Sequence, residues 1–279
     1  MNIITEKVIA SYTAWLIAEE RACSTCIKYT HYVRGFADCV KGAHVTKDAA
    51  IKYKALLSET RKAPSVNAAV AALNSFFSYM GWGIKLKPIK IQRKTFRTEV
   101  EEFTREEYER LLRAAQAKGD IRIRLIIETL CSTGIRVSEL CFMTVTAAQR
   151  GQALITNKGK ARLVFIPKSL QVSLLRYANE RKIDTGCIFI TSTKKPIDRR
   201  DIWLSMKALC KVANVKEEKV YPHNLRHLFA REFYNRHKDV VKLADVLGHS
   251  SLNTTRIYTM ESGAEHRKLV DELELVAVC

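Results

Sequence analysis

The sequence lacks any long apolar run and is poor in acidic residues relative to basic ones. Its apolar segments fall well short of the roughly 20 consecutive residues that a membrane-spanning helix needs, so we predict no membrane span. Only 29 aspartates and glutamates face 47 lysines and arginines, which leaves a net charge of +18. Because the positive charge is spread along the chain, we predict folded basic surfaces and a polyanionic partner, with nucleic acid the first candidate.

Two further absences bear on location and on metals. The N-terminal residues lack the apolar core and small-residue cleavage site of a secretory signal, so we expect the cytoplasm, where the 8 cysteines stay reduced. The one CxxC spacing, Cys23 to Cys26, has no second cysteine pair beside it. The His-x-x-x-His spacing of His223 and His227 lies near the other end of the chain. These spacings give no support to a zinc site, and we expect neither metal nor cofactor.

The apolar spacing predicts a mainly α fold with two domains. Residues 1–83 show four amphipathic helical stripes, the third helix capped by Thr46 and the fourth by Ser65, and we expect a compact N-terminal helical module. Residues 84–103 contain a proline, many lysines and no helical period. They are predicted to be a basic linker, which is either a solvated tether or a segment that lies along a phosphate backbone.

The remaining residues, 104–279, are predicted to form a mostly helical domain with a small antiparallel β-sheet. It opens with a capping box between Thr104 and Glu107. Strand-like apolar runs flank a hairpin turn, and helical patterns precede and follow them. The helical segments are 104–119, 121–131, 137–143 and 170–181, the strands are 153–156, 163–167 and 187–190, the turn is 157–160, and the rest is mainly helical.

Five residues of this second domain have side chains suited to chemistry on a DNA phosphate. An arginine fork grips a phosphate through two hydrogen bonds, histidine moves protons near neutral pH, and a tyrosine hydroxyl can attack phosphorus. Each residue alone also has an ordinary interpretation, as a surface arginine, a solvated helix face or a core tyrosine. The five are Arg136, His223, Arg226, His249 and Tyr258.

A lysine in the hairpin turn is the candidate acid for the oxygen that leaves phosphorus. Lys158 stands near the predicted phosphate site, and neighbouring positive charges would lower its pKa and ease proton donation. The competing interpretation is a turn lysine that touches a phosphate as a point charge. Lys160 is close enough to remain an alternative.

Four segments, taken in this order, resemble the motifs of the tyrosine recombinases, the lambda-integrase superfamily, and most of all its compact Xer-type members. Residues 133–140 resemble the first-arginine motif, and 158–162 resemble the lysine hairpin. Residues 222–227 are similar to the His-x-x-Arg box, and 247–259 to the nucleophile box. The N-terminal helices resemble the family's core-binding domain, which makes 104–279 the catalytic domain, with a C-terminal tail helix.

The resemblance implies a role for each residue. Tyr258 would form a 3′-phosphotyrosine and release a 5′ hydroxyl, while Arg136 and Arg226 hold the scissile phosphate. Lys158 would protonate the leaving oxygen. The two histidines would assist as well: His223 would take part in proton transfer from the tyrosine, and His249 would hydrogen-bond the phosphate. No ATP is implied, because the phosphotyrosine keeps the bond energy.

The resemblance also implies partners. These are double-stranded DNA and a homo-tetramer that exchanges strands between two duplexes through a Holliday junction, with room for an accessory protein or a second recombinase. The tail at 266–278 would dock on a neighbouring protomer or pack on its own chain. The implied reaction covers integration, excision, inversion and dimer resolution.

Two rival functions accompany this hypothesis. One is a DNA-binding module that keeps the fold without cutting, and the full set of site residues argues against it because such a module has no need of Tyr258. The other is a type IB topoisomerase, which uses the same chemistry. The helical module in front and the C-terminal tail favour recombination.

Overall fold

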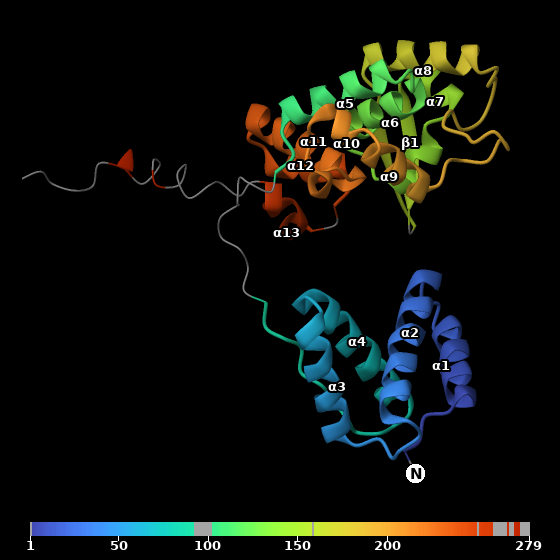
Figure 1. Ribbon diagram of the computed structural model, residues 1–279, viewed down its shortest axis with the longest axis vertical. Helices are drawn as coiled ribbons and strands as arrows, with labels where there is room; N and C mark the ends of the chain where they lie inside the picture. The colour runs from blue at the N-terminus through green and yellow to red at the C-terminus, as the bar shows by residue number, and fades with distance from the viewer. Residues whose placement is uncertain are drawn as a thin grey trace, which may run out of the picture. The chain divides into compact units, whose positions relative to one another are not determined.

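The computed structural model describes residues 2–91, 102–157, 159–249, 251–258, 267 and 271–273. The chain divides into two compact units, Met1–Lys94 and Thr95–Cys279. Helices dominate both units, and the described residues form one two-stranded antiparallel sheet (Figure 1). The predicted fold class, mainly α with a small antiparallel sheet, is confirmed.

The described part of the first unit is a bundle of four helices around an aromatic core. Rings such as those of Tyr12, Phe36 and Phe76 are fully buried, and the Tyr12 ring packs edge-on against Phe76 with centroids 5.2 Å apart. Burial of rings of this size is the main force that holds the helices together. The helices are α1 (Glu6–Ala18), α2 (Cys23–Val40), α3 (Lys47–Thr60) and α4 (Ala63–Tyr79).

The helix starts in this unit show where local sequence signals succeed and fail. Thr46 caps α3 as predicted, since its hydroxyl accepts a hydrogen bond from the Ala49 amide at 3.1 Å. The predicted cap at Ser65 is wrong. Helix α4 begins earlier, at Ala63, with Pro64 in its first turn and no side-chain cap. A proline in the first turn has no N–H and a φ already suited to a helix, which favours a start at this point.

Residues 84–91, within the segment predicted to be a linker, pack on the first unit. Leu86 is buried in its core, and the Asn74 side chain bonds both the Leu86 amide, at 2.8 Å, and its carbonyl, at 2.9 Å. The Asn67 side chain likewise bonds both the Ile89 amide, at 2.7 Å, and its carbonyl, at 2.9 Å. Residues 92–101 lie outside the described residues.

The second unit opens with α5 (Arg105–Ala117), and its predicted capping box is confirmed. The Glu107 amide donates to the Thr104 hydroxyl at 3.2 Å, and the Thr104 amide donates to the Glu107 carboxylate at 2.9 Å. The other elements are α6 (Ile121–Thr133), the 3-10 helix η2 (Val137–Phe142), α7 (Val145–Arg150), β1 (Gln152–Asn157), β2 (Lys160–Phe165), α8 (Lys168–Glu180), α9 (Arg199–Lys207), α10 (Cys210–Ala213), η3 (Glu217–Lys219), α11 (Pro222–His237), α12 (Val240–Leu247), α13 (Leu252–Thr255) and η4 (Arg256–Tyr258).

Helix α6 lies in the core of the second unit and sets up the functional residues. It is in contact with α5, α8 and α11, and Ile126, Ile127 and Leu130 are fully buried. The helix ends at Gly134, whose φ of 64° is left-handed, a conformation that glycine adopts without the penalty of a Cβ. The chain therefore turns sharply there and delivers Arg136 beside the end of the helix.

The hairpin turn lies where it was predicted, and both strands extend further towards it than expected. Strands β1 and β2 pair in register from Gln152 with Phe165 to Asn157 with Lys160, so only two residues connect them, Gly159 at φ 74° and Lys158. Lys158 lies outside the described residues, and so do most of the residues predicted to form the tail helix.

One local prediction for the second unit is wrong, and one short helix was not predicted. The predicted strand at 187–190 forms only isolated bridges, Thr144 with Cys187 and Ile190 with Pro196. No ladder can grow from Thr144, because that residue is the N-cap of α7 and the chain enters a helix immediately after it. Helix α7 itself was not predicted, since a helix of 6 residues is too short to show a period.

Candidate active site

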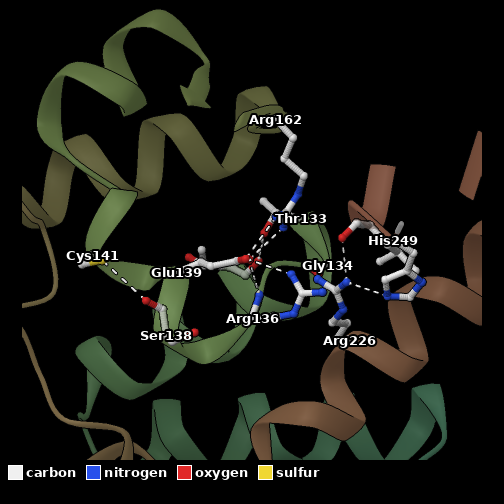
Figure 2. Close-up of polar contacts among 11 residues, drawn as sticks. Thr133, Gly134, Arg136, Ser138, Glu139, Cys141, Arg162, Arg226 and His249 are labelled. Atoms are coloured by element: carbon white, nitrogen blue, oxygen red, sulfur yellow. Dashed lines mark hydrogen bonds and ion pairs between the residues drawn. The ribbon is translucent and has the colours of Figure 1, made fainter. Parts of the chain in front are cut away.

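Arg226 stands at the centre of the site. Pro222 starts α11, and one turn later the Arg226 side chain is fully buried, with 1% of its surface exposed. Its guanidinium donates to the Gly134 carbonyl at 2.5 Å, to the Leu247 carbonyl at 2.7 Å and to His249 Nε2 at 3.0 Å (Figure 2). One side chain thereby ties together the ends of α6 and α12.

The charge of Arg226 is held by neutral partners. All three of its acceptors are uncharged, and burial, followed by the nearby charge of Arg136, lowers the pKa of Arg226 to about 10. A buried cation without a directly paired carboxylate is costly. The site therefore has a standing electrostatic preference for an anion.

Arg136 supplies the second guanidinium. It precedes η2, and Glu139 on that helix accepts from the Arg136 backbone amide at 2.8 Å and from its Nη1 at 3.0 Å. The Arg136 side chain is 39% exposed, whereas Glu139 is 1% exposed. A buried carboxylate thus holds an accessible guanidinium by one edge, as Figure 2 shows.

A third arginine, Arg162 on β2, joins the same carboxylate. Its two Nη atoms donate to the two oxygens of Glu139 at 3.0 and 2.7 Å. Burial acts to raise the pKa of Glu139, but the hydrogen bonds from Arg162 and Arg136 outweigh it and bring that pKa down to about 2. Glu139 is therefore ionised at any pH at which the protein is expected to work.

His249 follows Gly248, the left-handed cap of α12 at φ 66°, as predicted. Because arginine can only donate, His249 Nε2 accepts from Arg226, and the other ring nitrogen donates to the Thr255 hydroxyl at 2.9 Å. Burial and then the charges of Arg226 and Arg136 lower the pKa of His249 to about 4. The imidazole is therefore neutral near pH 7.

Tyr258 lies at the end of η4 and is buried beside this group. It packs with Ala230 and Leu247 in a small apolar cluster, and its ring lies 6.2 Å from that of His249, nearly parallel to it. Burial raises the pKa of Tyr258, while the charges of Arg226 and Arg136 act in the opposite direction. The phenol is protonated at neutral pH, so its use as a nucleophile requires a proton acceptor.

Two histidines of α11 connect the phenol to the accessible side of the site. The His227 ring contacts the Tyr258 ring edge-on, with centroids 4.9 Å apart, and the His223 ring lies 4.4 Å from that of His227. Burial comes first among the causes that lower the pKa of both rings, with His227 reaching about 4. Both rings are therefore neutral near pH 7, and each keeps one unprotonated ring nitrogen.

Three of these side chains, Arg136, His223 and Arg226, border a cavity of about 740 Å³. Arg199 and Arg200 at the start of α9 line another part of it. The aromatic side chains of Trp203 and Tyr221 complete the wall. Four guanidiniums around one cavity suit a polyanion, and two of them with neutral imidazoles and a phenol suit reaction at a phosphate.

The structure thus brings five of the six predicted site residues into one region of the second unit. Those five are Arg136, His223, Arg226, His249 and Tyr258. The sixth, Lys158, lies outside the described residues, and its alternative Lys160 is placed by its backbone alone. The residues that the structure describes contain no group of three His, Cys, Asp or Glu side chains placed to hold a metal ion.

Sequence reasoning missed three residues that the structure adds to the site. Arg162 fixes Glu139, His227 contacts Tyr258, and Thr255 accepts from His249. His227 directly follows Arg226, and Arg162 closes the hairpin segment, so both stood inside recognised motifs. Nothing local distinguished them, because their partners are distant in sequence.

Comparison with known proteins places the chain in a family. Residues 101–265, more than half of the chain, match the phage integrase family. The chain therefore belongs to the phage integrase family, the tyrosine recombinases, whose members cleave and rejoin DNA.

Two curated relatives match along nearly their whole length. Tyrosine recombinase XerA of Thermococcus kodakarensis is 30% identical over 281 residues, which cover 97% of this chain and 96% of the relative. XerA of Pyrococcus furiosus is 28% identical over 98% of this chain and 96% of its own.

Solved structures share the fold at lower identity. XerH recombinase bound to its difH substrate before cleavage is 22% identical, with a TM-score of 0.71 over 93% of this chain and 82% of its own. A lambda integrase tetramer bound to a Holliday junction is 19% identical, with a TM-score of 0.73 over 92% of this chain and 78% of its own.

In the part of the chain that the structure describes, none of the helices has the length and apolarity to cross a membrane.

Proposed function

We propose that the chain is a site-specific recombinase whose second unit cleaves DNA with Tyr258 as the nucleophile. The observation that carries the proposal is the meeting of one buried phenol, two guanidiniums and neutral histidines, of which Arg136, Arg226 and His223 line one cavity. Arg226 and Tyr258 are close enough for each to shift the pKa of the other, and Arg136 acts on both. A DNA phosphate bound between the two arginines would then lie next to the phenol.

The reaction balances with groups of this chain. The Tyr258 oxygen forms a bond to phosphorus, and the bond from phosphorus to the 5′ oxygen breaks, which leaves a 3′-phosphotyrosine and a 5′ hydroxyl. The phenolic proton passes to His223, directly or through His227, whose ring touches Tyr258. Lys158 gives a proton to the departing 5′ oxygen, and Lys160 is the alternative donor.

The two arginines neutralise the charge that builds up on the pentacoordinate phosphate. Removing one such donor typically costs about 10²–10³ in rate. His249 would add a hydrogen bond to the same phosphate. In the structure its Nε2 accepts from Arg226, so this role requires Arg226 to turn its N–H to the phosphate and His249 Nε2 to take up a proton.

Assembly follows from the same chemistry. The solved lambda integrase is a tetramer on a Holliday junction, and we propose that four protomers of this chain likewise pair two duplexes and exchange strands, with the C-terminal tail docked on a neighbour. Residues 1–83 would serve as a core-binding domain on DNA, 84–103 as the linker, whose first part, 84–91, packs on that domain, and 104–279 as the catalytic domain. An accessory protein or a second recombinase fits this scheme. Since DNA is the substrate, the cytoplasm is the proposed location.

A nicked duplex tests the nucleophile. Sequences that the protein selects from random DNA define a half-site, and a nick beside the cleavage point lets the short fragment diffuse away, so that the covalent adduct accumulates. Tyr258→Phe removes only the hydroxyl and is expected to abolish the adduct while binding persists. An adduct of undiminished yield in Tyr258→Phe would refute the assignment. Strand transfer between two duplexes separates recombination from a topoisomerase activity, which relaxes supercoils in one molecule.

A further inference from the structure

Arg162 takes no part in the proposed reaction steps, yet it binds a carboxylate inside the site. It donates to both oxygens of Glu139, and Arg136 donates to the same carboxylate twice, through its backbone and its Nη1. A carboxylate offers about four acceptor positions, so these four hydrogen bonds fill Glu139 completely. Figure 2 shows the carboxylate lying between the two arginines.

The sharing of Glu139 determines what Arg136 can do. Among the residues that the structure describes, Glu139 Oε1 is the one acceptor of the Arg136 guanidinium, through Nη1. Its other N–H groups remain for a ligand in the cavity that it lines. An unshared glutamate would instead favour a two-pronged pairing with Arg136, the arrangement that guanidinium and carboxylate prefer. Such a pairing would compete with a phosphate for the same donors.

The aliphatic part of the Arg162 side chain packs against the turn at Gly248. A Cβ placed on Gly248 would lie 2.6 Å from Arg162 Cδ and 3.0 Å from Nε, so the stem runs directly against the turn that carries His249. The Arg162 Nε atom is buried and has no hydrogen-bond partner among the described residues. The position of Arg162 therefore leaves one of its own donors unsatisfied. This favours the interpretation that Arg162 is placed to bind Glu139.

We propose that Arg162 is a positioning residue that occupies Glu139 and so keeps the Arg136 guanidinium open for the scissile phosphate. The inference rests on the proposed function. It assigns Arg162 no contact with DNA. Its effect reaches the phosphate only through Glu139 and Arg136, and it links the β2 strand of the lysine hairpin to the phosphate site.

The test compares two substrates with each protein. One is the nicked half-site duplex, and the other is the same duplex with an uncharged methylphosphonate in place of the scissile phosphate, which needs less neutralisation of charge. We expect Arg162→Ala to slow adduct formation on the phosphate by on the order of 10²-fold, and to lose much less on the methylphosphonate. Both substrates are tested with the same protein preparation. The ratio of the rate on the phosphate to the rate on the methylphosphonate is therefore unaffected by partial unfolding.

Three companion variants define the interpretation. Arg136→Ala should likewise lose much less rate on the methylphosphonate than on the phosphate. Glu139→Gln combined with Arg162→Ala should recover part of the rate lost in Arg162→Ala, because the competing carboxylate charge is gone. Lys219→Ala breaks a comparably buried ion pair with Glu107, at 15% and 12% exposure, and should leave the ratio of rates unchanged.

The outcomes separate the two proposals. Equal losses on both substrates, with no recovery in the double variant, would make Arg162 merely structural and overturn the inference. If wild-type protein forms no adduct that depends on Tyr258, the proposed function fails first, whatever Arg162 does.

Discussion

At the scale of single residues, the site combines groups that carry charge with groups that are kept neutral. Arg226 and Glu139 stay charged although both are buried, and each is surrounded by the hydrogen bonds that a buried ion requires. The histidines are held in the opposite state, because burial next to arginines disfavours a second positive charge. This division suits a site that must bind an anion and still accept a proton.

The neutral histidines predict a dependence of stability on pH. His227 and His249 have pKa values of about 4 in the folded protein, against 6.5 as the ordinary value. As pH falls from 6.5 towards 4, the unfolded chain takes up protons that the folded chain refuses, so the free energy of unfolding decreases. Urea unfolding at several pH values should show this decline, and His227→Gln should flatten it. A free energy that stays constant across this window would contradict the assigned histidine states.

At the scale of secondary-structure elements, the end of α6 carries the site. The Gly134 carbonyl accepts from Arg226, and a Cβ at Gly134 would lie 2.4 Å from a ring carbon of Phe229. Helix α6 therefore approaches α11 as closely as it does because residue 134 has no side chain.

Gly134→Ala is expected to damage both stability and activity. The left-handed backbone and the Phe229 contact together should cost about 1–3 kcal/mol, and the displaced carbonyl should slow adduct formation per folded molecule. Gly119→Ala is the matched control, since Gly119 has a φ of 68° with open space around it. Thermal unfolding and adduct rates for the two variants check this; equal adduct rates would show that the α6 end does not position the site.

Elements with strong local signals could be predicted from sequence. The α5 capping box, the glycine ends of α6 and α12 and the proline start of α11 all have causes within a few residues. The strand expected at 187–190 fails because its apolar residues are buried without a neighbouring strand to pair with. Likewise the pair of Arg162 with Glu139 joins residues far apart in sequence, and only the packing of the hairpin, through β1, against η2 brings them together. Local sequence patterns carry no information on such contacts.

At the scale of the whole molecule, the charge of +18 predicts DNA binding that depends strongly on salt. Contacts to about six or more phosphates would weaken binding by about 10³-fold or more between 50 and 200 mM salt. Arg200 lines the cavity beside Arg136, so Arg200→Ala should reduce the slope of log K against log salt by about 1.

A matched variant makes the salt measurement specific. Arg124→Ala removes the same charge from a residue already paired with Glu128 at 3.0 Å, and it should leave the slope unchanged. Fluorescence anisotropy of a labelled half-site over a salt series gives both slopes. A loss of affinity smaller than tenfold in wild-type protein would contradict the electrostatic account.

The most direct measurement is the identity of the residue that becomes attached to DNA. The trapped adduct can be digested with trypsin and nuclease, and the peptide that carries a nucleotide can be sequenced by mass spectrometry. We expect the peptide of residues 257–267 with the nucleotide on Tyr258, which is one of 10 tyrosines in the chain. A nucleotide on any other residue would contradict it.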